Sequence, residues 1–207
     1  MLKNGMVFIH VPLTGGTHLC KTFNRLNLVS YELNVPREDY AFLNGRTSRF
    51  AFVRHPWKWL LAYYRRKRTS GIDETVAIDL KMVKTNWNFN RWIKSIYDSN
   101  EPIVSEMMFS HVGRGSSRIE FVGHHETMAD DLNCLFGDSK EFVGKLIATA
   151  APPLEHHTAA SLNSFWRVVH YEQPIIQEFY QNAGSSPEVW FPAVPIDPIS
   201  RFHATCA

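Results

Sequence analysis

The segment from residue 6 to residue 26 constrains the fold more than any other part of the chain. Met6 to Val11 is a short apolar run rich in β-branched residues, and Pro12 and the pair Gly15-Gly16 follow it. This order predicts a buried strand that ends in a tight turn. From Thr17 to Leu26 the apolar residues recur at helical spacing, which predicts a helix. A glycine turn between a strand and a helix is typical of an anion-binding loop, because backbone N–H groups and the helix dipole favour negative charge there.

The rest of the chain continues the alternation of short strands and amphipathic helices. Further strands are predicted at 28–33, 49–53 and 119–122, and helices at 57–68, 75–96, 127–136, 142–148 and 164–181, with a loop at 150–161. Strands that alternate with helices indicate an α/β fold with a mainly parallel sheet covered by helices on both faces. A chain of 207 residues with 44% hydrophobic content is long enough for one domain with a substantial core. We therefore expect a single domain over residues 1–207.

Charge, cysteine content and apolar runs indicate which partners and which cellular compartment to expect. The formal net charge of +2 does not predict binding to nucleic acid. Cys20, Cys134 and Cys206 lie far apart and form no CxxC pair, which argues against a zinc knuckle or a disulfide scaffold and favours a reduced, cytoplasmic protein. No apolar run approaches the roughly 18 residues of a membrane span, and the first ten residues are too short and too soon interrupted for us to expect a signal peptide. No metal-binding motif is present, so neither a metal nor a membrane partner is expected.

Phe8 to Thr17 reads FIHVPLTGGT and resembles the segment F-I-H-x-P-K-T-G-G-T of carbohydrate-type sulfotransferases. In that family the loop binds the 5′-phosphosulfate of 3′-phosphoadenosine 5′-phosphosulfate. Nine of the ten positions agree, counting the variable one, and the departure is Leu13, where the family has lysine. The loop is neither a Walker loop nor a dinucleotide G-x-G-x-x-G pattern. The resemblance assigns cofactor binding to Pro12, Leu13, Thr14, Gly15, Gly16, Thr17 and His18.

A second segment, Phe50 to Trp57, reads FAFVRHPW and resembles the family block F-x-F-V-R-[DN]-P-[FY]. The resemblance implies that Arg54 binds the 3′-phosphate of the nucleotide, a task that suits a planar guanidinium. The family usually has a serine eight residues after this arginine, and that position is Ala62 here. One hydrogen bond to the phosphate is therefore missing. The two blocks lie about 40 residues apart, each at the end of a strongly predicted strand, in the order and at the spacing found in the family.

A third and looser match begins at Glu120-Phe121-Val122-Gly123-His124-His125-Glu126 and continues through Met128 and Asp131-Leu132. It is similar to the family segment F-V-G-R-x-E-x-L-x-x-D-L, with His124 at the usual arginine. Together the three blocks imply a P-loop-like, three-layer α/β/α fold around a central, mainly parallel sheet. They also imply an enzyme that moves a sulfuryl group to a hydroxyl of a sugar or small metabolite and releases 3′-phosphoadenosine 5′-phosphate.

Sulfuryl transfer develops negative charge on the bridging phosphate oxygen, which a positive group or N–H donors must stabilise. Leu13 cannot do this. Three replacements are open: His18 on the first helical turn, Lys21 one turn further along, and the backbone N–H groups of residues 15–17. We favour His18, because the family usually has a serine there and the side chain should face the phosphosulfate.

The reaction also needs a general base for the acceptor proton. His10 matches the family's strand-end histidine, although a core histidine bonded to backbone fits this position equally well. Glu32 lies on the second predicted strand, near where acceptors approach in related enzymes. His55 is a third candidate, and its position beside Pro56 favours a structural role.

Three functions stay open on the sequence. The first is an active sulfotransferase. The second is a non-enzymatic relative that binds a nucleotide or a partner, since Leu13 and Ala62 are losses at the two phosphate sites. The third is another nucleotide-dependent enzyme such as a small kinase, which needs a magnesium site and a loop lysine, and neither is found in the sequence. The basic run Arg65 to Arg68 is either a solvated helix end or part of a surface for an acidic substrate.

Overall fold

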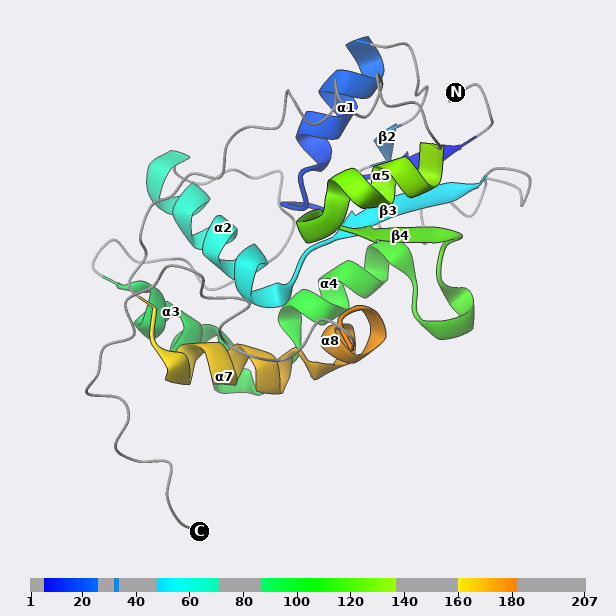
Figure 1. Ribbon diagram of the computed structural model, residues 1–207. Helices are drawn as coiled ribbons and strands as arrows, with labels where there is room; N and C mark the ends of the chain where they lie inside the picture. Colours follow the sequence, from blue (N-terminus) through cyan, green and yellow to red (C-terminus); the bar gives the residue numbers. More distant parts are fainter. Residues whose placement is uncertain (1–5, 26–31, 34–47, 71–86, 137–159, 182–207) are drawn as a thin grey trace. The chain divides into compact units, whose positions relative to one another are not determined.

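The computed structural model describes residues 6–25, 32–33, 48–70, 87–136 and 160–181 (Figure 1). These residues form a mixed α/β structure that is mostly helical and contains a small, open, parallel sheet. The chain divides into two compact units, residues 1–55 with 106–154 and residues 56–105 with 155–207. The helix predicted at 142–148 lies outside the described residues, and the single domain over 1–207 stays a prediction.

The first unit holds the sheet. Its strands are β1 (Val7–Ile9), β2 (Glu32–Leu33), β3 (Arg49–Val53) and β4 (Phe121–His124), in the order β2-β1-β3-β4. Each neighbouring pair is parallel, which confirms the predicted parallel sheet. β2 contributes only two residues, so the sheet consists mainly of three strands.

The last strand differs from its predicted range of 119–122. β4 begins at Phe121, two residues later than predicted, and ends at His124. The strand was predicted to end before Gly123, but it continues through this glycine. Gly123 pairs with Phe52 of β3, and a Cβ at position 123 would lie 2.6 Å from the Phe52 ring. The glycine therefore permits close packing within the strand and does not end it.

Two helices cover one face of this sheet, α1 (Gly16–Arg25) and α5 (Met128–Phe136) (Figure 1). Phe8, Phe50 and Phe52 project to this face, because residues two apart in a strand share a side and paired residues face the same way. They pack in one core cluster with residues of both helices: Leu19, Cys20, Phe23 and Leu132. The predicted apolar faces of both helices are therefore confirmed.

The second unit is helical and has an aromatic core. It contains α2 (Pro56–Ser70), α3 (Phe89–Ile96), η2 (Tyr97–Ser99), α7 (Leu162–Tyr171) and α8 (Gln173–Phe179). α2 begins at a proline, whose fixed φ suits the first helical position. Trp57 of α2 packs edge-on against Phe89 and Phe165, and Tyr63 stacks on Trp92. Large rings thus join α2 to α3 and α7.

Two of the predicted helices are too long. α3 starts only after Asn88, whose side chain accepts a hydrogen bond from Arg91 N, so no helix runs unbroken through residues 87 and 88. The predicted helix at 164–181 is two helices, with Glu172 between them outside ideal helical geometry. Pro174 explains this break, because it has no N–H to donate to the preceding turn.

One helix, α4 (Ile103–Val112), has no counterpart among the predicted elements. Its first turn belongs to the second unit, where the buried carboxylate of Glu172 accepts hydrogen bonds from Val104 N (2.9 Å) and Ser105 N (2.7 Å). Ser105 Oγ (2.6 Å) and Tyr97 Oη (2.7 Å) donate to the same carboxylate. Glu172 therefore acts as the N-terminal cap of α4, although it is distant in sequence.

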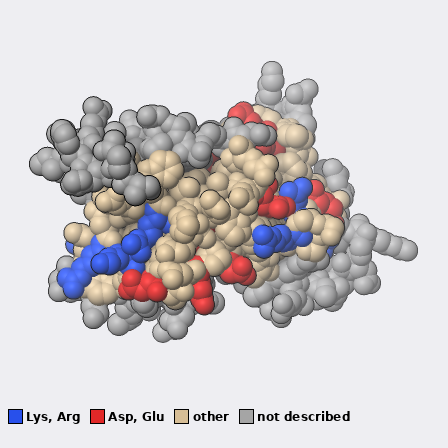
Figure 2. Space-filling view, turned by 90° about the horizontal axis from the view of Figure 1, so that it is seen from below, with Lys and Arg blue, Asp and Glu red and all other residues tan. Residues whose placement is uncertain are grey.

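Charges of both signs lie on the described surface. Figure 2 shows one face of it, on which Lys and Arg side chains form two separate groups, each with Asp or Glu side chains near it. Adjacent charges of opposite sign attract a distant polyanion less than a surface of one sign does. Among the described residues, no helix is both long and apolar enough to cross a membrane.

Candidate anion-binding site

The loop that joins β1 to α1 has an unusual backbone. Leu13 and Gly15 both have positive φ, 60° and 88°. Glycine adopts this left-handed conformation without strain, whereas for a leucine it costs on the order of 1–2 kcal/mol. Such strain persists only where the surroundings hold it, and it often accompanies function. The loop is therefore a shaped turn, as its sequence predicts.

Gly16 has no room for a side chain. A Cβ at this position would overlap the imidazole ring of His10. His10 is 8% exposed, and its ring lies parallel to Phe8 at 6.1 Å between centroids. Its burial favours a packing role beneath the loop, and its assignment as a general base stays a prediction.

Helix α1 begins at Gly16, directly after the loop. Gly15 O accepts hydrogen bonds from His18 N (3.1 Å) and Leu19 N (3.2 Å), which closes the first turn. His18 lies half-buried on this turn, as the sequence predicts. Thr14 is fully buried and its hydroxyl donates to Val11 O (2.8 Å), so that proton serves the loop itself. Thr17, in contrast, is exposed.

Arg54 brings the second motif to this loop. It follows the last residue of β3, and its Nη1 donates to Leu13 O at 3.1 Å. The contact joins residues 41 positions apart, because β1 and β3 are parallel neighbours whose carboxyl ends meet at one edge of the sheet. The guanidinium thus helps to hold the left-handed Leu13 and places a positive charge beside the start of α1.

Residues of the third motif contact both the glycine loop and the segment that contains Arg54. A Cβ on Gly15 would lie 3.0 Å from Met128 Cε and 3.2 Å from His125 Cδ2. His55, which is 2% exposed, donates its backbone N–H to Glu126 Oε1 at 3.0 Å. The buried position of His55 agrees with the structural role expected for it. The sequence match at 120–132 pointed to this segment but not to its contacts.

A third buried histidine belongs to the same unit. His111 of α4 is 7% exposed, and its Nδ1 lies 2.8 Å from Met107 O. Burial lowers its pKa, the bond to Met107 opposes this shift, and nearby His10 lowers the pKa further. An imidazole that is neutral near pH 7 suits the interior of this unit. Sequence analysis did not single out His111, because α4 itself was not predicted.

The remaining predicted residues lie apart from this cluster. Glu32 opens β2 opposite Phe8, but its side chain lies outside the described residues. Ala62 is half-buried on α2, in the second unit, and its place at the 3′-phosphate stays a prediction. Lys21 is exposed on α1.

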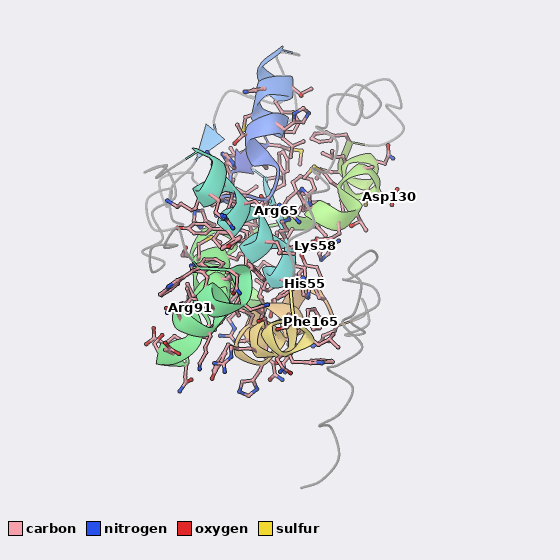
Figure 3. All side chains as sticks on the ribbon, turned by 90° about the vertical axis from the view of Figure 1, so that its left-hand side faces the viewer. His55, Lys58, Arg65, Arg91, Asp130 and Phe165 are labelled. Atoms are coloured by element: carbon pink, nitrogen blue, oxygen red, sulfur yellow. The ribbon has the colours of Figure 1, made fainter. Side chains whose placement is uncertain are left out.

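The basic run at the end of α2 is partly packed on its own helix. Lys67 Nζ lies 5.4 Å from the Tyr63 ring centroid, and Arg68 Cζ lies 5.7 Å from that of Tyr64. Arg68 Nη1 also donates to Tyr64 Oη at 3.1 Å. Arg65 precedes these residues on the same helix (Figure 3). Burial lowers the pKa of its guanidinium. Arg66 and Arg68 are nevertheless exposed, so both interpretations of the run stay open.

The described residues contain no group of three or more His, Cys, Asp or Glu side chains placed to hold a metal ion. Comparison of the chain with family models, with curated proteins and with solved structures gives no match. The geometry of the loop, of Arg54 and of the 124–128 turn is therefore the basis on which a function is proposed.

Proposed function

We propose that this protein is a sulfotransferase, which moves a sulfuryl group from 3′-phosphoadenosine 5′-phosphosulfate to a hydroxyl of a sugar or small metabolite. The hydrogen bond from Arg54 to Leu13 O carries the proposal. It joins the two segments to which the family resemblance assigns the two phosphate groups of one nucleotide. The same bond brings the guanidinium to the loop, beside the start of α1.

The residues present fit such a nucleotide. Gly15 and Gly16 let Met128, His125 and His10 pack closely on the turn and so hold its shape. The turn leads into the start of α1, where backbone N–H groups and the helix dipole favour an anion. In the proposal, residues 12–18 hold the 5′-phosphosulfate and Arg54 holds the 3′-phosphate. The cofactor supplies the activated sulfuryl group, while the chain binds and orients it. The P-loop-like, three-layer α/β/α fold and the cytoplasmic location belong to the same proposal.

Because position 13 is a leucine and not the lysine of the family, we expect a low rate of sulfuryl transfer. Loss of one donor aimed at developing charge costs about 2.7–4 kcal/mol of barrier, or roughly a hundredfold to a thousandfold in rate. His18 is the replacement that we propose, since it lies half-buried on the first turn of α1. His10 and Glu32 are the proposed bases. A slow enzyme is therefore expected.

The activity test is transfer of labelled sulfate to a panel of sugars and small hydroxylated metabolites. We expect slow turnover in the unmodified protein and an increase of at least about tenfold in Leu13→Lys. Arg114→Ala is the control variant, because Arg114 is exposed and stacks on Phe109 outside the loop. No transfer by either the unmodified protein or Leu13→Lys would contradict the proposal.

A second candidate function is a relative that binds the nucleotide without catalysis. The observation in its favour is that Arg54 already uses one donor on Leu13 O, at a loop without its lysine. This candidate predicts nucleotide binding with no turnover, and no gain of activity in Leu13→Lys.

A further inference from the structure

The turn between β4 and α5 touches both segments of the proposed nucleotide site. It consists of η4 (His125–Thr127) with His124 before it and Met128 after it. His125 and Met128 lie against Gly15, and Glu126 reaches His55. The turn thus joins the glycine loop to the residue that follows Arg54.

Glu126 holds the backbone directly after Arg54. Its Oε1 accepts the His55 N–H at 3.0 Å. Because Pro56 has no N–H, His55 provides the last backbone donor before α2 begins. The bond therefore fixes the peptide from which the Arg54 side chain projects.

The turn that carries Glu126 is itself fixed. Asp131 Oδ2 accepts hydrogen bonds from His124 N (2.7 Å) and Thr127 Oγ1 (2.9 Å), on either side of Glu126. A Cβ on Gly123, just before the turn, would lie 3.1 Å from Asp131 Cβ, so strand and helix are closely packed there. Glu126 thus reaches His55 from a rigid base.

We propose that Glu126 is a positioning residue of the nucleotide site, which sets the direction of the Arg54 guanidinium toward the 3′-phosphate. The inference rests on the proposed function, since it takes the 3′-phosphate as the ligand of Arg54. Glu126 itself does not touch the nucleotide. It acts through the His55 peptide, while His125 and Met128 keep the loop beside it.

The test compares two nucleotides by calorimetry, 3′-phosphoadenosine 5′-phosphate and adenosine 5′-monophosphate, on the full chain. The ratio of their affinities reports the contribution of the 3′-phosphate. Glu126→Gln keeps an acceptor oxygen and should keep the ratio. Glu126→Ala and Glu126→Asp, which is too short to reach His55, should lower it by about tenfold, since a misdirected arginine loses a charge-assisted bond. Affinity for the monophosphate should fall less, since residues 12–18 hold its 5′-phosphate in the proposal.

Glu120→Gln is the matched control, because this carboxylate binds Arg49 at the other end of the same strands and should leave the ratio unchanged. An unchanged ratio in folded Glu126→Asp would overturn the positioning role, even where Glu126→Ala fails to fold. A parallel loss with Glu126→Gln would overturn it as well. If the unmodified protein shows no preference for the 3′-phosphate, both this inference and the proposed function fail.

Discussion

Replacement of Glu172 by alanine should strongly destabilise the helical unit that surrounds it. The carboxylate is fully buried and accepts four hydrogen bonds, from Tyr97 Oη, Val104 N, Ser105 N and Ser105 Oγ. Alanine leaves these donors buried without their acceptor. Each unsatisfied buried donor costs about 1–3 kcal/mol, and loss of a helix cap about 0.5–2 kcal/mol.

The four costs do not add fully, because the cavity can admit water and the hydroxyl groups can rotate. We expect a loss of about 3–5 kcal/mol in the free energy of unfolding, the range found when one partner of a buried charged network is removed. Urea denaturation followed by circular dichroism measures it. Glu101→Ala, a change at an exposed residue of the same unit, is the control and should stay within about 0.5 kcal/mol of the unmodified protein. A Glu172→Ala protein equally close to the unmodified stability would refute the assigned network.

Other predictions concern pH and the loop. Burial raises the pKa of Glu172, and its hydrogen bonds oppose this shift. The contribution of the raised pKa to the free energy of unfolding is therefore fully present below the usual pKa near 4.5 and is lost as pH rises through the raised value. Glu172→Gln should flatten this part of a stability–pH profile. Glu120 behaves oppositely: hydrogen bonds from Arg49 lower its pKa to about 2, so its stabilising effect is present above pH 4.5 and is lost as pH falls toward 2. Glu120→Gln should remove that acid-side dependence at a cost below about 1 kcal/mol, since the pair is half-exposed. Gly16→Ala should cost about 1–3 kcal/mol in thermal unfolding, because its Cβ meets the His10 ring, and a neutral result would contradict the packing described for the loop.

The parts of the fold that local pattern determines were predictable. The β1 segment, the glycine loop and α1 follow from an apolar run, a glycine pair and helical spacing, and all lie within 20 residues of one another. The family resemblance implied that Arg54 and the loop serve one nucleotide, whereas the strand order that makes β1 and β3 neighbours is known only from the structure. In this part of the chain the local signals and the tertiary structure agree.

Contacts between distant segments were not predictable in the same way. Glu172 reads in the sequence as an interior residue of one long helix, whereas it caps α4 from 68 residues away. Pro174 did signal the break beside it, and a stricter use of that signal would have divided the helix. The bond between Glu126 and His55 has no local signature at all, since the two residues are 71 positions apart and meet just beyond the paired ends of β3 and β4.

Binding of 3′-phosphoadenosine 5′-phosphate, measured by calorimetric titration, tests the central claim most directly. We predict saturable binding by the unmodified protein, and its loss in Arg54→Ala but not in Arg114→Ala, because Arg54 alone of these two meets the loop. No binding by the unmodified protein, or equal binding by Arg54→Ala, would contradict a nucleotide site built on Arg54 and residues 12–18.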